Sequence, residues 1–196
     1  MIDAETRRAL SDCMAEEIAF DVPMARHTSL RVGGPVDALA TPGDRPALAR
    51  LLRTCARLGV PHHLVGGGFN TLVLDGGLDG VAIQLKRFRR LEERPGGAVR
   101  AEAGVSHASI TRFCATRGLA GLEFGAGIPG TLGGWVAMNA GIGRRVVVDV
   151  VREVEVMSPT GRRRSHLGRD ALHFTYRALR GLAPGSVIVS ALLAVS

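Results

Sequence analysis

The sequence is poor in cysteine, lysine and the large aromatic residues. Its three cysteines, Cys13, Cys55 and Cys114, lie far apart and form no CxxC pair, so neither a disulfide framework nor a zinc site is indicated. One tryptophan and one tyrosine are too few to stack bases along a nucleic acid. The uncharged stretch 124–143 is too rich in glycine for a membrane span, and the N-terminus has no signal core. We therefore expect a cytoplasmic protein with neither a nucleic-acid nor a membrane partner.

Positive charge is carried almost entirely by arginine. The formal net charge is +7, and Lys86 is the only lysine among 25 basic residues. Guanidinium groups suit phosphate and carboxylate groups. The arginines are scattered rather than clustered, which leaves an anionic ligand and an ordinary solvated surface as alternatives. His62 and His63 lack a third ligand, so no metal site is predicted.

The hydrophobic periodicity predicts an α+β fold in two lobes, because helices and strands do not alternate regularly over the 196 residues. We expect an N-terminal helix over 1–19, a first lobe over 20–88 and a second over 89–196. Asp44 and Gly59 are typical boundaries of a helix between them, and Ser106 and Gly118 of another. The predicted strands are 36–40, 63–65, 72–74, 81–83, 99–103, 146–157 and 187–195.

Glycine is abundant, with 26 residues, and it is concentrated in two segments. The first is Gly66-Gly67-Gly68-Phe69-Asn70-Thr71 and the second is Gly127-Ile128-Pro129-Gly130-Thr131-Leu132-Gly133-Gly134. Glycine lets consecutive backbone N–H groups converge on an anion, and a short helix expected from about Thr131 would add donors. Two such loops suit a diphosphate, with tight turns and close packing as the alternative. Neither segment is a Walker A motif, and 72–74 reads as a strand where a Rossmann fingerprint needs a helix.

A set of short motifs gives the sequence a family resemblance over about residues 20–195. They are Arg31-Val32-Gly33-Gly34, Gly66-Gly67-Gly68-Phe69-Asn70-Thr71, Gly121-Leu122-Glu123-Phe124, Ala126-Gly127-Ile128-Pro129-Gly130-Thr131, Met138-Asn139-Ala140-Gly141 and Phe174-Thr175-Tyr176-Arg177. Their order and spacing resemble the UDP-N-acetylenolpyruvoylglucosamine reductase (UDP-N-acetylmuramate dehydrogenase) family. The resemblance implies a two-lobed FAD-binding domain of the vanillyl-alcohol-oxidase or para-cresol-methylhydroxylase type.

The resemblance also implies a reaction, in which NADPH reduces bound FAD and the flavin reduces an enolpyruvyl UDP-sugar during peptidoglycan precursor synthesis. Segments 66–71 and 127–134, except Leu132, would cradle the FAD pyrophosphate, and Asn139, Ala140 and Gly141 would lie beside them. Arg177 would be the catalytic residue that stabilises the enolate-like charge, and Tyr176 would bind substrate with it. The alternative function is a non-catalytic FAD-binding module with a regulatory or scaffolding role.

The sequence departs from the resembled family at several places. Phe69 stands where a serine is common, and Trp135 occupies a position where small residues are usual. Leu179 replaces a serine, and 142–145 replace a segment that usually contains Ala-Tyr-Gly. The family's third domain, which closes over substrate and supplies a proton donor, has no counterpart before Ser196. We therefore expect an incomplete enzyme, for which a separately encoded C-terminal domain is a candidate partner.

Overall fold

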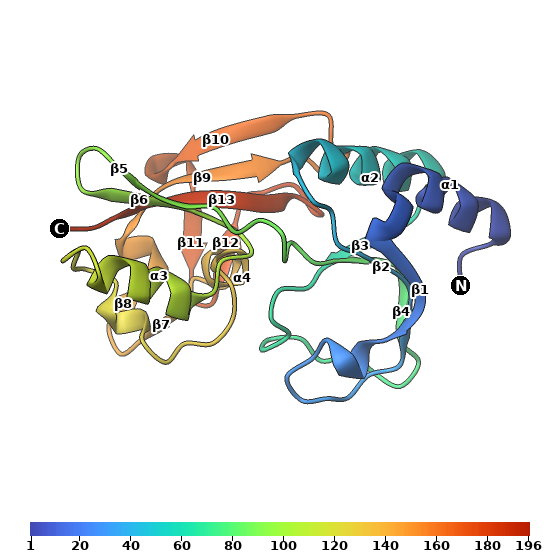
Figure 1. Ribbon diagram of the computed structural model, residues 1–196, viewed down its shortest axis with the longest axis horizontal. Coiled ribbons are helices and arrows are strands. Elements are labelled where there is room, and N and C mark those ends of the chain that lie inside the picture. Colours follow the sequence, from blue (N-terminus) through green and yellow to red (C-terminus); the bar gives the residue numbers. More distant parts are fainter. The chain divides into compact units, whose positions relative to one another are not determined.

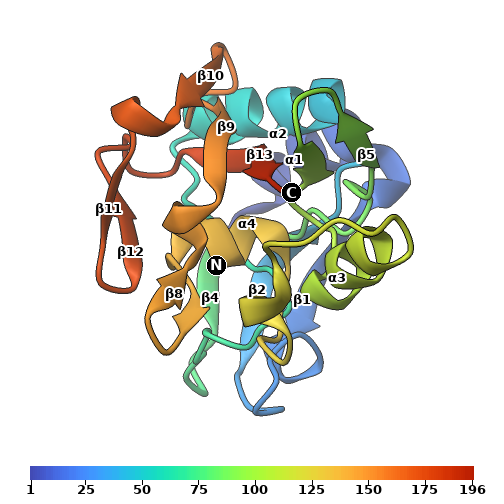
Figure 2. The ribbon, with the colours of Figure 1, turned by 90° about the vertical axis from the view of Figure 1, so that its left-hand side faces the viewer.

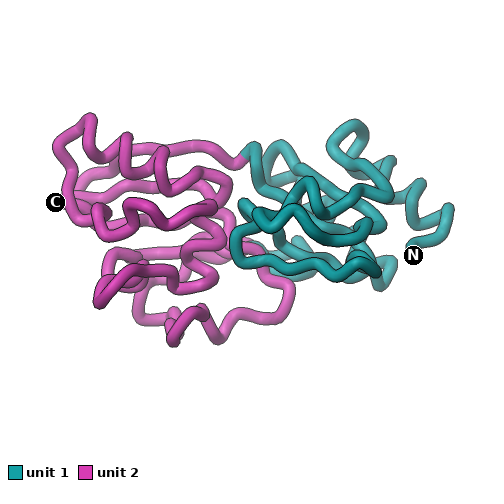
Figure 3. The backbone as a smooth tube through the Cα atoms, turned by 90° about the horizontal axis from the view of Figure 1, so that it is seen from below, with its two compact units in different colours: residues 1–87, 157–163 teal, residues 88–156, 164–196 magenta.

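The computed structural model describes residues 1–196 and divides the chain into two compact units (Figure 3). Unit 1 comprises residues 1–87 and 157–163, and unit 2 comprises residues 88–156 and 164–196. The expected division differs from this one, because it set 1–19 apart and gave 157–163 to the second lobe. The turn 157–163 belongs to unit 1 because Arg53 Nη1 donates a hydrogen bond to the carbonyl oxygen of Gly161 at 3.2 Å.

Unit 1 contains a four-stranded sheet in the order β1-β2-β4-β3. Strand β1 runs antiparallel to β2, whereas β2 and β3 both run parallel to β4. Helices α1 and α2 pack on each other (Figure 1). The elements are α1 Ala4–Met14, η1 Ala15–Glu17, β1 Ile18–Pro23, η2 Met24–Arg26, β2 Pro35–Ala40, α2 Arg45–Leu58, β3 His62–Leu64 and β4 Leu78–Ile83. Because β2, β3 and β4 are parallel, the loop that follows β3 leaves from their shared carboxyl edge.

Helix α2 begins and ends where the sequence predicts. The Asp44 side chain accepts a hydrogen bond from the N–H of Ala47 at 2.7 Å, which caps the first turn. Gly59 ends the helix with φ 66°, and its N–H donates to the carbonyl of Cys55. The stripe that α2 buries is Ala47, Leu48, Leu51, Leu52 and Cys55.

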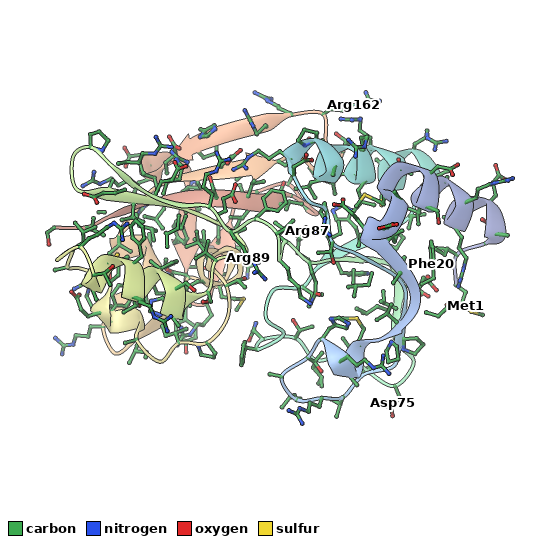
Figure 4. The ribbon with its side chains drawn as sticks, viewed as in Figure 1. Met1, Phe20, Asp75, Arg87, Arg89 and Arg162 are labelled. Carbon is green, nitrogen blue, oxygen red and sulfur yellow. The ribbon has the colours of Figure 1, made fainter.

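The predicted helix over 1–19 is too long, because α1 ends at Met14 and Ile18 starts strand β1. Ala15 adopts a positive φ of 49°, which interrupts the helix. Arg7 on α1 reaches back to Asp21 on β1 with N–O distances of 2.6 and 2.7 Å, and its Cζ lies 5.1 Å from the ring centroid of Phe20, which Figure 4 labels. Ile18 has the spacing of the helix's apolar residues but lies on strand β1. No glycine or proline between Met14 and Ile18 marks the end of the helix in the sequence.

Unit 2 contains a five-stranded sheet in the order β10-β9-β13-β6-β5. Figure 2 shows helices α3 and α4 on one side of this sheet, and their apolar residues form one core with its strands. The strands and helices are β5 Leu91–Arg94, β6 Ala98–Glu102, α3 His107–Ala115, α4 Leu132–Ala137, β7 Gly141–Ile142, β8 Arg145–Val146, β9 Val151–Met157, β10 Arg164–Gly168, β11 His173–Thr175, β12 Ala178–Arg180 and β13 Val187–Ala194. Three 3-10 turns, η3 Glu123–Gly125, η4 Val147–Asp149 and η5 Arg169–Ala171, join them.

One predicted strand is absent and another is shorter than predicted. Residues 72–74 form no strand, because the N–H of Gly34 donates one hydrogen bond to the carbonyl of Leu74 and no ladder of strand hydrogen bonds forms. The predicted strand 146–157 is broken by η4, since the Asp149 side chain accepts from the N–H of Val146 at 2.9 Å and turns the chain. The small hairpins β7–β8 and β11–β12 were not predicted. No helix in the structure combines the length and the apolar character that crossing a membrane requires.

Candidate functional site

The first glycine segment, 66–71, forms the loop after β3 in unit 1. Val65 fixes its start, because its N–H donates to the carbonyl of Ile83 at 3.0 Å. The carbonyl oxygen of Gly68 accepts two hydrogen bonds from Ser29, one from the N–H and one from the hydroxyl, both at 3.1 Å. A Cβ at Gly68 would lie 2.2 Å from the carbonyl oxygen of His27, and the φ there is +73°. Glycine is therefore required where the stretch 27–29 clamps the loop.

Backbone donors are exposed on this loop. The N–H groups of Gly66, Gly67 and Phe69 donate to no group of the chain, and all three residues are exposed. Asn70 is exposed and Thr71 is half-buried. A run of unpaired N–H groups without obstructing side chains is the arrangement by which backbone binds an anion. The loop therefore fits a phosphate group through its backbone.

The surroundings of this loop are apolar. Leu72 and Leu74, which follow it, are 66% and 73% exposed, and Leu30 on the clamping stretch is 64% exposed. The Phe69 side chain is itself 56% exposed. Figure 4 places Asp75 at the outer end of this part of unit 1, away from α1 and α2. Apolar surface beside unpaired N–H groups suits a ligand that combines rings with phosphate.

The second glycine segment, 127–134, belongs to unit 2 and leads into α4. The helix begins at Leu132, as expected, but its first N–H groups are already used. Leu132 donates to the carbonyl of Val105 at 2.9 Å, and Gly133 donates to the carbonyl of Ala103 at 3.0 Å. The expectation that this helix start offers free donors is therefore wrong for these two groups.

The unpaired donors of this segment lie earlier in the chain. The N–H groups of Gly127 and Gly130 make no hydrogen bond within the chain, whereas Ile128 donates to the carbonyl of Gly125 at 2.9 Å. A Cβ at Gly127 would meet nothing within 4 Å, so a ligand has access to its backbone. Pro129, which is exposed, has no N–H group to offer, Thr131 is half-buried and Gly134 is exposed.

Asn139, Ala140 and Gly141 lie where α4 meets the two hairpins. Asn139 is 7% exposed and has a φ of 41°. Its Nδ2 donates to the carbonyl of Thr175 at 3.0 Å, and its Oδ1 accepts from the N–H of Val148 at 3.2 Å. Both polar atoms of this side chain therefore bind backbone groups. Its N–H also donates to the carbonyl of Val136 at 3.1 Å, which leaves the Asn139 carbonyl oxygen as the backbone group that could contact a cofactor.

Tyr176 and Arg177 form the two-residue turn of the β11–β12 hairpin, because Thr175 pairs with Ala178. Arg177 has a φ of 54°, and its Nη1 donates to the carbonyl of Gly141 at 3.2 Å. Tyr176 is 90% exposed, and its ring centroid lies 5.6 Å from Cζ of Arg177. The structure thus joins the Asn139–Gly141 motif to the Tyr176–Arg177 motif within unit 2.

Electrostatics near the two segments favour neutral imidazoles. Burial lowers the pKa of His27, whose carbonyl touches Gly68, and the nearby charge of Lys86 lowers it further. Burial also lowers the pKa of His107, on α3. At neutral pH both rings therefore act as neutral packing and hydrogen-bonding groups.

Sequence reasoning missed the residues that hold the two segments in place. Ser29 and His27 belong to the stretch before Arg31-Val32-Gly33-Gly34. The neighbouring motif was the only indication in the sequence that this stretch contributes to the site. In unit 2, Gly125 lies against the rings of His107 and Trp135. Nothing in the local pattern pairs residues so distant along the chain.

Comparison with known proteins identifies the family of the chain. The family model of the FAD binding domain matches residues 36–165. The chain is 40% identical over 192 residues to UDP-N-acetylenolpyruvoylglucosamine reductase from Geotalea uraniireducens, covering 98% of this chain and 63% of the relative. It is 49% identical over 175 residues to the reductase of Geobacter metallireducens, covering 89% of this chain and 57% of the relative. The chain thus spans about three fifths of the length of these relatives.

Solved structures show the same fold. The crystal structure of UDP-N-acetylenolpyruvylglucosamine reductase from Thermus caldophilus matches with a TM-score of 0.76 and 31% identity, over 89% of this chain and 61% of that one. An alkyldihydroxyacetonephosphate synthase structure matches with a TM-score of 0.72 at 18% identity, over 100% of this chain and 41% of that one, and so shows the fold alone. The predicted α+β fold of the vanillyl-alcohol-oxidase type is confirmed. The chain belongs to the FAD binding domain family, and over most of its length it is similar to UDP-N-acetylenolpyruvoylglucosamine reductases.

Proposed function

We propose that the chain is the FAD-binding part of an NADPH-dependent reductase that converts UDP-N-acetylenolpyruvoylglucosamine to UDP-N-acetylmuramate in the cytoplasm. The observation that carries this proposal is the pair of glycine segments with unpaired N–H groups, at Gly66, Gly67 and Phe69 in unit 1 and at Gly127 and Gly130 in unit 2. The similarity to reductases over most of this chain supplies the reaction.

The backbone of each segment fits a phosphate group of a dinucleotide. Unpaired N–H groups bind phosphate oxygens without needing a charged side chain, and the glycines let the ligand approach closely. The exposed apolar residues Leu30, Leu72 and Leu74 offer surface for the rings of a dinucleotide. FAD, when bound, supplies the capacity to accept a hydride from NADPH and to pass it to the enolpyruvyl group.

Arg177 and Tyr176 are the proposed substrate-binding residues of this chain, with Arg177 as the catalytic one. The guanidinium is permanently charged and can stabilise the negative charge that develops when hydride adds to the enolpyruvyl group. Its bond to the carbonyl of Gly141 orients it without neutralising it. The reduction also needs a proton donor, and a separately encoded domain is the source that we propose for it.

The proposal is tested in two steps on the purified chain. The first step is a titration with FAD, followed by flavin fluorescence, which should show saturable binding. The second step follows NADPH oxidation with and without the enolpyruvyl UDP-sugar, with the chain alone and with the substrate domain of a relative added in trans. Arg177→Ala should keep FAD affinity and reduce turnover by about 10²–10³-fold.

The outcomes separate the two candidate functions. FAD binding with sugar-dependent NADPH oxidation in either arm supports the reductase. FAD binding without turnover in both arms supports the alternative, a non-catalytic flavin-binding module. A chain that binds no FAD contradicts both.

A further inference from the structure

Four side chains of unit 2 form a continuous row of ring contacts beside the second glycine segment. The ring of Phe124 stacks on the indole of Trp135, with centroids 5.6 Å apart and an interplanar angle of 21°. The indole meets the ring of His107 edge to face at 4.4 Å. The guanidinium of Arg145 lies 5.0 Å from the centroid of Phe124, and its Nη2 donates to the carbonyl of Gly121 at 3.2 Å. We call Arg145, Phe124, Trp135 and His107 the aromatic stack.

Gly125 rests directly on this stack. A Cβ at Gly125 would lie 2.2 Å from Nε2 of His107 and 2.5 Å from Cζ2 of Trp135, so no side chain fits between the backbone and the rings. The carbonyl of Gly125 accepts the N–H of Ile128 at 2.9 Å, and the N–H of Ala126 donates to the carbonyl of Glu123 at 2.9 Å. The rings therefore determine where the backbone after Gly125 runs, including the unpaired N–H of Gly127.

Trp135 and His107 are built into the core and act through their rings. Each is 4% exposed, and the indole N–H of Trp135 has no hydrogen-bond partner. A buried indole without an acceptor contributes apolar area and shape rather than a hydrogen bond. Burial keeps His107 neutral by lowering its pKa, so the edge-to-face contact involves no charge.

We propose that Trp135 and His107 are positioning residues for cofactor binding, because they support Gly125 and thereby place the N–H groups of Gly127 and Gly130 for the FAD diphosphate. This inference rests on the proposed function and deepens it. It assigns the bulky Trp135, which stands where small residues are usual in the resembled family, a role in the binding segment of this chain.

The test compares four variants of the full chain. Trp135→Ala removes the support, and Gly125→Ala inserts a methyl group between backbone and rings at a residue whose φ is not positive. Trp135→Phe keeps an aromatic ring and loses only the unpaired N–H group with part of the ring area. Phe113→Ala is the matched control, because this ring on α3 packs on the same core and its ring contact is with Arg117, whose Cζ lies 3.7 Å from the ring centroid.

Two readouts are measured, the FAD dissociation constant and the hydrogen exchange of the Ala126 and Ile128 amides in the apoprotein. Trp135→Ala and Gly125→Ala should weaken FAD binding by about tenfold or more, because displaced binding groups lose affinity steeply. Both should also lose protection at the two amides. Trp135→Phe and Phe113→Ala should stay within about threefold of the wild type, whatever the change in thermal stability.

The inference fails if Trp135→Ala and Gly125→Ala bind FAD as tightly as the Phe113→Ala control does. Should Trp135→Ala not fold, Gly125→Ala and Trp135→Phe still decide, since one disturbs the contact and the other preserves it. A wild-type chain without FAD affinity overturns the proposed function and this role together. Wild-type binding with unaffected variants overturns the positioning role alone.

Discussion

Asn139 holds the hairpin that presents Tyr176 and Arg177, and replacing it should destabilise unit 2 measurably. Its side chain donates to the carbonyl of Thr175 at 3.0 Å and accepts from the N–H of Val148 at 3.2 Å. Its φ of 41° lies in the left-handed region, which asparagine tolerates better than alanine. Asn139→Ala removes both hydrogen bonds. It also places alanine, for which the left-handed region costs more free energy than for asparagine, at this φ.

The magnitude follows from these two contributions. Each hydrogen bond contributes about 0.5–1.5 kcal/mol net, so the pair contributes about 1–3 kcal/mol. The left-handed backbone adds about 1–2 kcal/mol for alanine. Asn139→Ala should therefore lower the free energy of unfolding by about 2–5 kcal/mol, and Asn139→Gly, which tolerates the backbone angle, by about 1–3 kcal/mol.

The assay is urea unfolding followed by the fluorescence of Trp135, the only tryptophan in the chain, which lies in α4 of unit 2. The change in midpoint at constant slope gives the change in free energy. The difference between the two variants isolates the backbone contribution. Equal midpoints for the wild type and both variants would refute the account of Asn139, as would an alanine variant that is more stable than the glycine variant.

Three further predictions concern ionisation and the first loop. Burial raises the pKa of Cys55 to about 12 from its usual 9.0. The contribution of the protonated Cys55 thiol to the free energy of unfolding is therefore fully present below pH 9.0 and is lost as the pH rises towards 12. From about pH 8 to about pH 10 the free energy of unfolding should fall by about 1 kcal/mol more in the wild type than in Cys55→Ala, and parallel pH profiles in urea titrations would contradict this. Burial lowers the pKa of His107 below 6.5. The contribution of the neutral imidazole to the free energy of unfolding is therefore fully present above pH 6.5 and declines as the pH falls through the pKa of the folded state. Trp135-monitored unfolding should show this decline in the wild type but not in His107→Gln, and an increase in stability on acidification would speak against it. Phe69→Ser, at a side chain 56% exposed, should change the free energy of unfolding by less than about 0.5 kcal/mol and leave FAD binding intact. Loss of FAD affinity in this variant would argue against a backbone cradle.

The parts of the fold that sequence reasoning predicted are those with local signals. Asp44 and Gly59 mark the ends of α2 by chemistry that acts within a few residues, and Ser106 does the same for the start of α3. The strand 72–74 was predicted from an apolar pattern, yet only Val73 is buried there while Leu72 and Leu74 are exposed. Tertiary contacts with the stretch around Gly34, rather than strand pairing, decide its conformation.

The candidate site has the same division between local signals, which the sequence carries, and tertiary contacts, which it does not. The glycine segments could be located by composition, but which N–H groups stay unpaired depends on partners such as the carbonyls of Val105 and Ala103. The turn at Tyr176-Arg177 carries no glycine, asparagine or proline, so a hairpin with Arg177 at positive φ gave no signal. The bond between Arg177 and Gly141 joins residues far apart in the sequence, and only the fold brings them together.

The central claim is that unpaired backbone N–H groups of the glycine segments bind phosphate groups of FAD. It is tested most directly by measuring the dissociation constants of FAD and of riboflavin, which has the same isoalloxazine ring but lacks the diphosphate and the adenosine, for the wild-type chain. The account predicts saturable FAD binding with at least about a hundredfold preference over riboflavin, the equivalent of a few hydrogen bonds to charged oxygens. Equal affinity for the two ligands, or no FAD binding, would contradict it.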